Sequence, residues 1–288
     1  MNIASPCTGI CKLDQTTGWC LGCGRSGDEI ADWGIQSETW RDRVLGHIPD
    51  RLQQLGVTFR RLPWTAGDIH RFVIDSLEAG RGTWVMGVVG AVAEFTAPAN
   101  AKVDVQVKDA DLVAHTPNGA MQIVIDDHVR ALAFDPPDVG KAPRIVLAVK
   151  RERGRLPVAD GTADLGQDQG ALFAEPGAHL FDLGLGRKEA RFCVRVAGGQ
   201  SRDALTSEAG LSLADSLPRI GAALLADSPT RVVETALGRM EVQGRIPPPD
   251  ARSPDGPHTH LLPGHLASGR ALPVGMDLPR AYLPGAIF

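Results

Sequence analysis

Four of the five cysteines lie within the first 23 residues, and their spacing is suited to binding a metal. Cys7, Cys11, Cys20 and Cys23 form the pattern C-x3-C-x8-C-x2-C, whereas Cys193 lies far downstream. Four thiolates that converge on one point suit tetrahedral Zn²⁺ or an iron-sulfur cluster. We predict one metal centre here, with Zn²⁺ favoured and an iron-sulfur cluster as the alternative. Disulfides or reduced thiols without a metal remain the third option.

Glycines and a polar turn are placed to bring the two cysteine pairs together. Gly22 and Gly24 flank the last cysteine and let the backbone turn tightly, so that amide N–H groups can point at the sulfurs. Pro6 and Gly9 occupy the same kind of bend around the first pair. Residues 14–18 (DQTTG) form a polar turn that is expected to return the chain between the pairs.

Two short helices are expected after the cysteines. Ser26 and Glu29 form a capping box at the start of the first. Ser37 caps the second, and Pro49 is expected to open its last turn, which ends at Gly56. This region has too few apolar residues for an independent core, so metal binding would supply folding free energy.

The four cysteines and the motif D-E-I-x-x-W at 28–33 carry a family resemblance. Residues 3–56 resemble a widespread bacterial family of small proteins of unknown function, usually labelled predicted iron-sulfur proteins. The resemblance implies a metal-binding module at the N-terminus.

The bulk composition excludes several classes of protein. The chain has 288 residues, is 43% hydrophobic and 22% charged, and carries a formal charge of -4. No basic stripe marks a nucleic-acid binder, so we expect no DNA or RNA partner. The most apolar run, 84–95, is too short to span a bilayer and contains Glu94, so we expect no membrane anchor. The first residues lack the pattern of a signal peptide, and the protein is expected to be cytoplasmic.

Residues 57–288 are predicted to form one uncharacterised domain, after a four-cysteine metal-binding module at 1–56. A helix is expected at 68–77, and Pro218 is expected to split a helical segment at 203–226. Hairpin signals occur at 117–119 (PNG) and at Gly238. Strand-like runs occur at 84–95, 102–107, 111–116, 120–125, 144–149, 190–196, 231–237 and 239–246. The predicted class is α+β: a small N-terminal metal knuckle with short helices, then a largely antiparallel sheet domain with flanking helices.

Three histidines near the C-terminus form a second candidate site. His258, His260 and His265 lie within eight residues, and H-x-H spacing can present two imidazoles to one metal. Glu94 is the candidate partner, because a carboxylate in a very apolar run is costly to bury unless it has a partner. The competing interpretations are loop histidines bonded to backbone and a Glu94 that faces solvent at a strand end.

A second resemblance is carried by the motifs W-x-M-G-x-x-G-A-V-A-E-F at 84–95, F-C-V-R at 192–195, L-G-R-M-E-V at 237–242 and S-P-D-G-P-H-T-H-L-L-P at 253–263. Together they resemble an uncharacterised bacterial domain family, which implies no activity. The chain has no dinucleotide fingerprint, Walker A motif or nucleophile elbow. Cys193 lies on an alternating strand pattern, which favours a buried inert thiol over a nucleophile.

Three functions are compatible with these patterns. The leading hypothesis is a metal-binding protein in which a structural four-cysteine module is fused to a domain that binds a protein or small-molecule partner. The second is an iron-sulfur protein that transfers electrons or senses redox state. The third is a metal-dependent enzyme that uses the C-terminal histidines.

Overall fold

The structure is a computed structural model of the chain, and it confirms the predicted α+β class. Every pairing between the described strands is antiparallel, as the hairpin signals predict. The structure describes residues 5–9, 12–57, 59–79, 83–88, 91–96, 102–134, 144–149, 156–157, 159–186, 190–246 and 281–283.

Two helices follow the cysteines, α1 (Gly27–Asp32) and α2 (Glu38–Gln54). The predicted capping box is present: Glu29 N donates to Ser26 Oγ at 3.2 Å, and Ser26 N donates to Glu29 Oε2 at 2.8 Å. The last turn expected after Pro49 is part of α2, which continues through the proline to Gln54 and is followed by Gly56 with a φ of +67°. Buried side chains on both sides of the proline hold the helix together by packing: Val44, Ile48 and Leu52.

A six-stranded sheet has the order β1-β7-β8-β14-β2-β3. The run 84–95, predicted as a single strand-like run, folds into a hairpin in which Trp84 lies opposite Phe95. Both aromatic side chains are buried there as a cross-strand pair. The strands are β1 (Phe59–Arg61), β2 (Thr83–Val88), β3 (Ala91–Thr96), β7 (Val129–Phe134), β8 (Arg144–Val149) and β14 (Ala281–Leu283).

An eight-stranded sheet has the order β4-β5-β6-β13-β12-β11-β10-β9. Both predicted hairpins are confirmed, β5 with β6 and β12 with β13. Gly238 is required, because a Cβ there would lie 1.9 Å from the carbonyl oxygen of Gln122 on β6. The strands are β4 (Asp104–Lys108), β5 (Asp111–Thr116), β6 (Gly119–Val124), β9 (Ala163–Gln167), β10 (His179–Asp182), β11 (Ala190–Val196), β12 (Thr230–Thr235) and β13 (Gly238–Val242).

Helix α3 (Ala66–Glu78) confirms the prediction at 68–77 and begins two residues earlier. Its N-terminus is closed by a capping box in which Asp68 N donates to Thr65 Oγ1 at 3.2 Å and Thr65 N donates to Asp68 Oδ2 at 3.0 Å. The hydrogen bonds that Thr65 donates to the Asp68 carboxylate, from its backbone N–H first and from its hydroxyl second, lower the pKa of that carboxyl below its ordinary value of 3.8.

Replacing Asp68 with alanine is expected to reduce the free energy of unfolding by about 1 kcal/mol at pH 7, since the carboxylate's half of the capping box is lost while Thr65 still caps the helix. Because the folded pKa is depressed, this contribution is full above about pH 4 and is lost as the pH falls through the folded pKa. Denaturant unfolding at pH 7 and pH 3 should show the difference shrinking in acid. Asp75→Ala, an exposed change in the same helix, is the control, and an equal loss at both pH values would contradict the carboxylate's role.

The helical segment at 203–226 is split, but not at the predicted place. Helix α4 (Gln200–Ser207) and helix α5 (Leu213–Asp227) are separated around Gly210, which has a φ of +87°. Pro218 lies inside α5, so the prediction that it splits the segment is wrong. A glycine with positive φ ends a helix readily, whereas α5 continues through Pro218 because side chains on both sides of the proline are buried: Ser216, Ile220 and Leu224.

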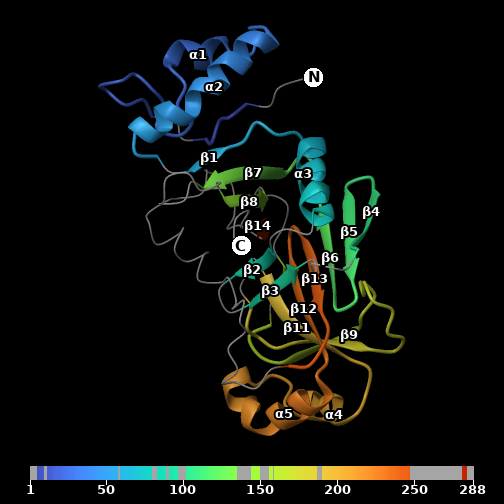
Figure 1. Cartoon of the computed structure of the whole chain (residues 1–288). Coiled ribbons are helices and arrows are strands. Elements are labelled where there is room, and N and C mark those ends of the chain that lie inside the picture. The colour runs from blue at the N-terminus through green and yellow to red at the C-terminus, as the bar shows by residue number, and fades with distance from the viewer. Residues whose placement is uncertain are drawn as a thin grey trace.

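The main core lies between one face of the eight-stranded sheet, the hairpin β2–β3 and helix α3. A second cluster packs α4 and α5 against β10 and β11. Figure 1 shows α1 and α2 at one end of the molecule, α4 and α5 at the other, and the sheets between them. No helix in the described ranges is long and apolar enough to cross a membrane.

Candidate metal centre and buried charge network

The N-terminal module, residues 5–56, returns the chain at the predicted polar turn. Asp14 Oδ2 accepts from the backbone N–H groups of Thr16 at 3.1 Å and Thr17 at 2.8 Å. Beyond the turn, an isolated bridge pairs Leu13 with Cys20 in the antiparallel direction. The turn thus brings the segment after the first cysteine pair beside the start of the second pair.

Both cysteine pairs carry the same hydrogen bond from backbone to sulfur. Gly9 N donates to Cys7 Sγ at 3.4 Å, and Gly22 N donates to Cys20 Sγ at 3.4 Å. Gly24 has a φ of +70° and donates to the carbonyl of Cys20 at 2.8 Å. N–H groups aimed at sulfur stabilise negative charge on it, so both bends suit thiolates.

Arg25 is a cation in direct contact with the second pair. It is only 3% exposed, and its Nε donates to Cys23 Sγ at 3.4 Å. Its guanidinium lies 4.6 Å from the centre of the Trp33 ring, a distance typical of a cation–π contact. Burial raises the pKa of the Cys23 thiol, and this outweighs the opposing hydrogen bond from Arg25.

Arg61 on β1 connects the module to the six-stranded sheet. Its Nη1 donates to the carbonyl of Cys7 at 2.9 Å. Burial lowers the pKa of Arg61 to about 10, with repulsion from Arg130 acting in the same direction and Cys7 opposing it. Arg61, which belongs to the predicted larger domain at 57–288, therefore places a guanidinium beside the backbone of the first cysteine.

The predicted metal ligands fall partly outside the described residues. Cys7, Cys20 and Cys23 are described, whereas Cys11 is not. Within the described residues, no three histidine, cysteine, aspartate or glutamate side chains are gathered in a way that could hold a metal ion. The four-cysteine centre and the metal that it binds therefore stay predictions.

The second candidate site lies almost entirely outside the described residues. His258, His260 and His265 are not described. Glu94 is described: it is half-buried on β3, opposite Val85 of β2. Its pairing with the histidines stays a prediction.

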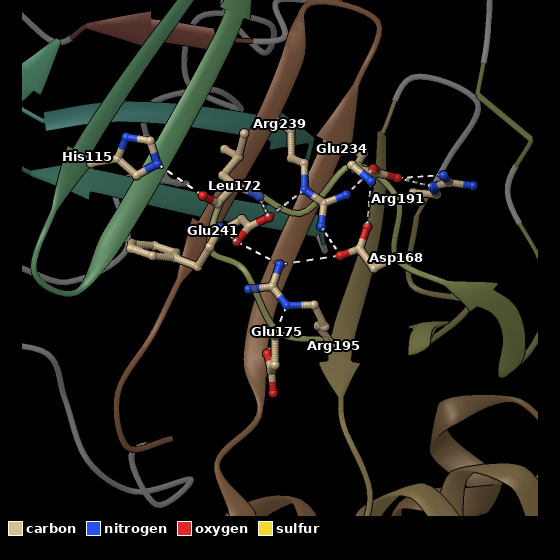
Figure 2. A network of polar contacts seen from close by, with 11 residues as sticks. His115, Asp168, Leu172, Glu175, Arg191, Arg195, Glu234, Arg239 and Glu241 are labelled. Atoms are coloured by element: carbon tan, nitrogen blue, oxygen red, sulfur yellow. Dashed lines mark hydrogen bonds and ion pairs between the residues drawn. The ribbon is translucent and has the colours of Figure 1, made fainter. Parts of the chain in front are cut away.

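The face of the eight-stranded sheet that points away from the main core carries a network of buried charges that the sequence analysis did not identify (Figure 2). Strand register places Glu234 of β12 opposite Arg191 of β11 on one side and opposite Arg239 of β13 on the other. Arg191 Nε donates to Glu234 Oε2 at 2.6 Å, and Arg239 Nη1 donates to Glu234 Oε1 at 2.7 Å. The charge network consists of Asp168, Glu175, Arg191, Arg195, Glu234, Arg239 and Glu241.

Glu241 is the centre of this network. It is 0% exposed and accepts from Arg195 Nη1 at 2.7 Å and from Arg239 Nε at 2.8 Å. It also accepts from the backbone N–H groups of Leu172 at 2.8 Å and Phe173 at 3.3 Å. One carboxylate thereby joins two arginines of the sheet to the loop at 168–178.

Charges in the network stabilise one another. Burial disfavours the charged form of Arg195, but hydrogen bonds to Glu241 and Glu175 outweigh it and raise the arginine's pKa. The pKa of Arg239 is raised in the same way, against burial, by Asp168 and Glu234. Paired buried ions tolerate removal of one partner poorly, so the network is expected to fix the loop on the sheet.

Cys193 lies on the same strand as Arg191 and Arg195 and is fully buried. Burial raises the pKa of its thiol strongly, and the carboxylates of Asp182 and Glu234 raise it further. A thiol in these surroundings is not nucleophilic, which agrees with the prediction of an inert cysteine.

A sequence signal for the network exists. The strand 190–196 (ARFCVRV) places two arginines four residues apart in an apolar run, and 239–241 (RME) places an arginine and a glutamate two residues apart. Charges at alternate positions share one face of a strand. Pairing between distant strands decides which of these charges meet, and a single strand does not reveal that.

Comparisons with known proteins agree with both resemblances at the level of families. The model of a protein of unknown function (DUF1289) matches residues 5–52, and that of a family of unknown function (DUF6925) matches residues 68–288. The uncharacterized protein YdhL of Escherichia coli K12 is 40% identical over 52 residues, which cover 18% of this chain and 65% of YdhL. YdhL of Shigella flexneri matches with the same identity and coverage.

The chain thus spans about 65% of the length of these curated relatives. No solved structure matches the chain. The descriptions of the matching families and relatives name no metal, so the iron-sulfur label gains no support from them. The division into 1–56 and 57–288 also stays a prediction.

Proposed function

The chain belongs to the family of unknown function DUF6925, and from this premise we propose that it is a metal-binding protein with an accessory four-cysteine module. In this proposal Cys7, Cys11, Cys20 and Cys23 hold one structural metal, with Zn²⁺ favoured. The metal orders the N-terminal module, and the larger domain binds a protein or small-molecule partner. A cytoplasmic location fits the proposal, because thiols stay reduced there.

The observation that carries the proposal is the matched pair of N–H to sulfur hydrogen bonds. Gly9 donates to Cys7 and Gly22 donates to Cys20 at the same distance, 3.4 Å, although the two bends differ in sequence. Two repeated bends of this kind suit sulfurs that carry negative charge. A reduced thiol without a metal would gain little from such donors, which supports a bound metal.

Nearby cations support the same proposal. Four thiolates around one divalent ion leave a net negative charge, which a cation close by offsets. Arg25 is buried beside Cys23, and Arg61 of the larger domain is hydrogen-bonded to the backbone of Cys7. When bound, a structural Zn²⁺ supplies folding free energy to a module too small to form a core alone.

Elemental analysis of the full chain, purified without a histidine tag, tests the proposal. We expect about one zinc per chain and no visible absorbance, since Zn²⁺ has a filled d shell. A brown protein containing iron would favour the iron-sulfur alternative instead. Absence of any bound metal would overturn both. Cys193→Ala is the control, and its metal content should equal that of the wild type.

The same analysis addresses the third hypothesis, a metal-dependent enzyme that uses His258, His260, His265 and Glu94. Binding of a second equivalent of metal, lost on substitution of His258 and His260, would support it. A metal titration of the full chain that saturates at one equivalent would count against this hypothesis.

A further inference from the structure

We propose that one edge of the Arg195 guanidinium, formed by Nε and Nη2, is the binding site for the carboxylate of a small-molecule ligand, and that Glu175 is the group which the ligand displaces. This inference rests on that part of the proposed function which assigns ligand binding to the larger domain. It does not involve the cysteines.

This edge of Arg195 is half used: among the described residues, one of its two donor atoms is hydrogen-bonded and the other is not. On the other edge, Nη1 donates to Glu241 at 2.7 Å and to Asp168 at 3.3 Å. Nε donates to Glu175 Oε2 at 2.9 Å, and Figure 2 shows Glu175 facing this side of the guanidinium. Nη2 is buried and has no hydrogen-bond partner in the part of the chain that the structure describes.

A carboxylate matches this half-used edge in shape. The N–H groups of Nε and Nη2 point in the same direction and can donate in parallel to the two oxygens of one carboxylate. Glu175 engages only one of them. A buried donor without a partner is costly, so a ligand that pairs both atoms gains more than Glu175 does.

Glu175 is the one acidic partner of Arg195 that can leave. Its side chain is 37% exposed, whereas those of Asp168 and Glu241 are 3% and 0% exposed. Glu175 can therefore turn into water while the other two carboxylates keep Arg195 in place.

Charge selects the class of ligand. When the carboxylate of Glu175 is replaced by that of a ligand, the net charge around Arg195 does not change. Inorganic phosphate carries more negative charge at neutral pH and would add to the three carboxylates left in the charge network: Asp168, Glu234 and Glu241. The flank of the site is apolar, since Leu180 of β10 is buried directly opposite Arg195. A small monocarboxylate with an apolar body fits best.

Benzoate and inorganic phosphate are the probes for this site, and calorimetric titration of the full chain is the measurement. Removal of the competing group in Glu175→Ala is expected to tighten benzoate binding at least tenfold relative to the wild type. Glu78→Ala removes the same charge from the exposed end of α3 and should leave the affinity unchanged. Phosphate is expected to bind neither variant.

A second substitution tests whether the paired donors Nε and Nη2 of Arg195 bind the ligand. In the Glu175→Ala background, Arg195→Lys keeps the charge but not the paired donors, and should abolish the tighter binding while thermal unfolding reports whether the protein folds. Equal benzoate affinity for Glu175→Ala and the wild type would overturn the proposal, whether or not the lysine variant folds. Phosphate binding as tight as that of benzoate would overturn it too. Metal content, measured in parallel, reports separately on the cysteines.

Discussion

Replacing Cys23 with serine is expected to abolish metal binding at the N-terminal module and to unfold that module. Cys23 is 3% exposed and accepts a hydrogen bond from Arg25, whose guanidinium makes a cation–π contact with Trp33, so it links the proposed centre to the small apolar contacts of the module. Binding of a structural Zn²⁺ contributes about 10–16 kcal/mol to the folding of small zinc modules, far more than the packing of α1 and α2 could supply.

Circular dichroism and limited proteolysis of the full chain are the measurements for this substitution. The variant should lose the helical signal of α1 and α2 and become cleavable within residues 5–56, while the larger domain stays resistant. Cys193→Ala is the matched control, because it removes a buried thiol far from the module. A Cys23→Ser protein that keeps an ordered module without metal would contradict the proposed role of the metal.

Replacing Glu241 with alanine is expected to lower the free energy of unfolding of the larger domain by about 3–5 kcal/mol. Glu241 accepts from Arg195 and Arg239 and from two backbone N–H groups of the loop at 168–178. Its loss leaves two buried guanidiniums with fewer partners and releases Leu172 and Phe173 from the sheet.

Denaturant unfolding followed by tryptophan fluorescence measures this loss. Glu208→Ala is the control, since its partner Arg219 is 55% exposed and solvent screens such a pair, so its loss should change stability little. Hydrogen exchange should show residues 168–178 opening in Glu241→Ala only. Similar losses of unfolding free energy in the two variants would contradict the central role of Glu241 in the charge network.

Local signals in the sequence predicted much of the fold correctly. Ser26 with Glu29 predicted a capping box, and Asn118 with Gly119 predicted a hairpin, because each signal acts over a few residues. Pro218 was misleading for the same reason. Pro49 and Pro218 disfavour a helix locally, but the buried residues around them in α2 and α5 compensate.

Strands with weak patterns were missed. Strand β9 is mostly exposed and contains Gly166, so it lacks the alternation of apolar and polar residues that marks a strand. Strand β9 forms because it pairs with β10, where His179 lies opposite Gln167. Tertiary context of this kind cannot be read from a window of five residues.

The two candidate sites differ in how far the sequence could predict them. The cysteine spacing is local, so Cys7, Cys20 and Cys23 could be identified as candidates at once. The charge network joins Asp168, which directly follows β9, to Arg239 on β13. The two residues are 71 apart in the sequence and meet because the loop after β9 is held against β13 by Glu241. Charges on separate strands give no sign of pairing until the strand order is known.

The central claim is that four cysteine sulfurs hold one zinc ion. X-ray absorption at the zinc edge of the purified full chain tests it most directly, because it reports the identity and distance of the ligand atoms. We predict four sulfur ligands at about 2.3 Å and no nitrogen or oxygen ligand. Fewer than four sulfurs, or a chain that binds no zinc, would contradict the claim.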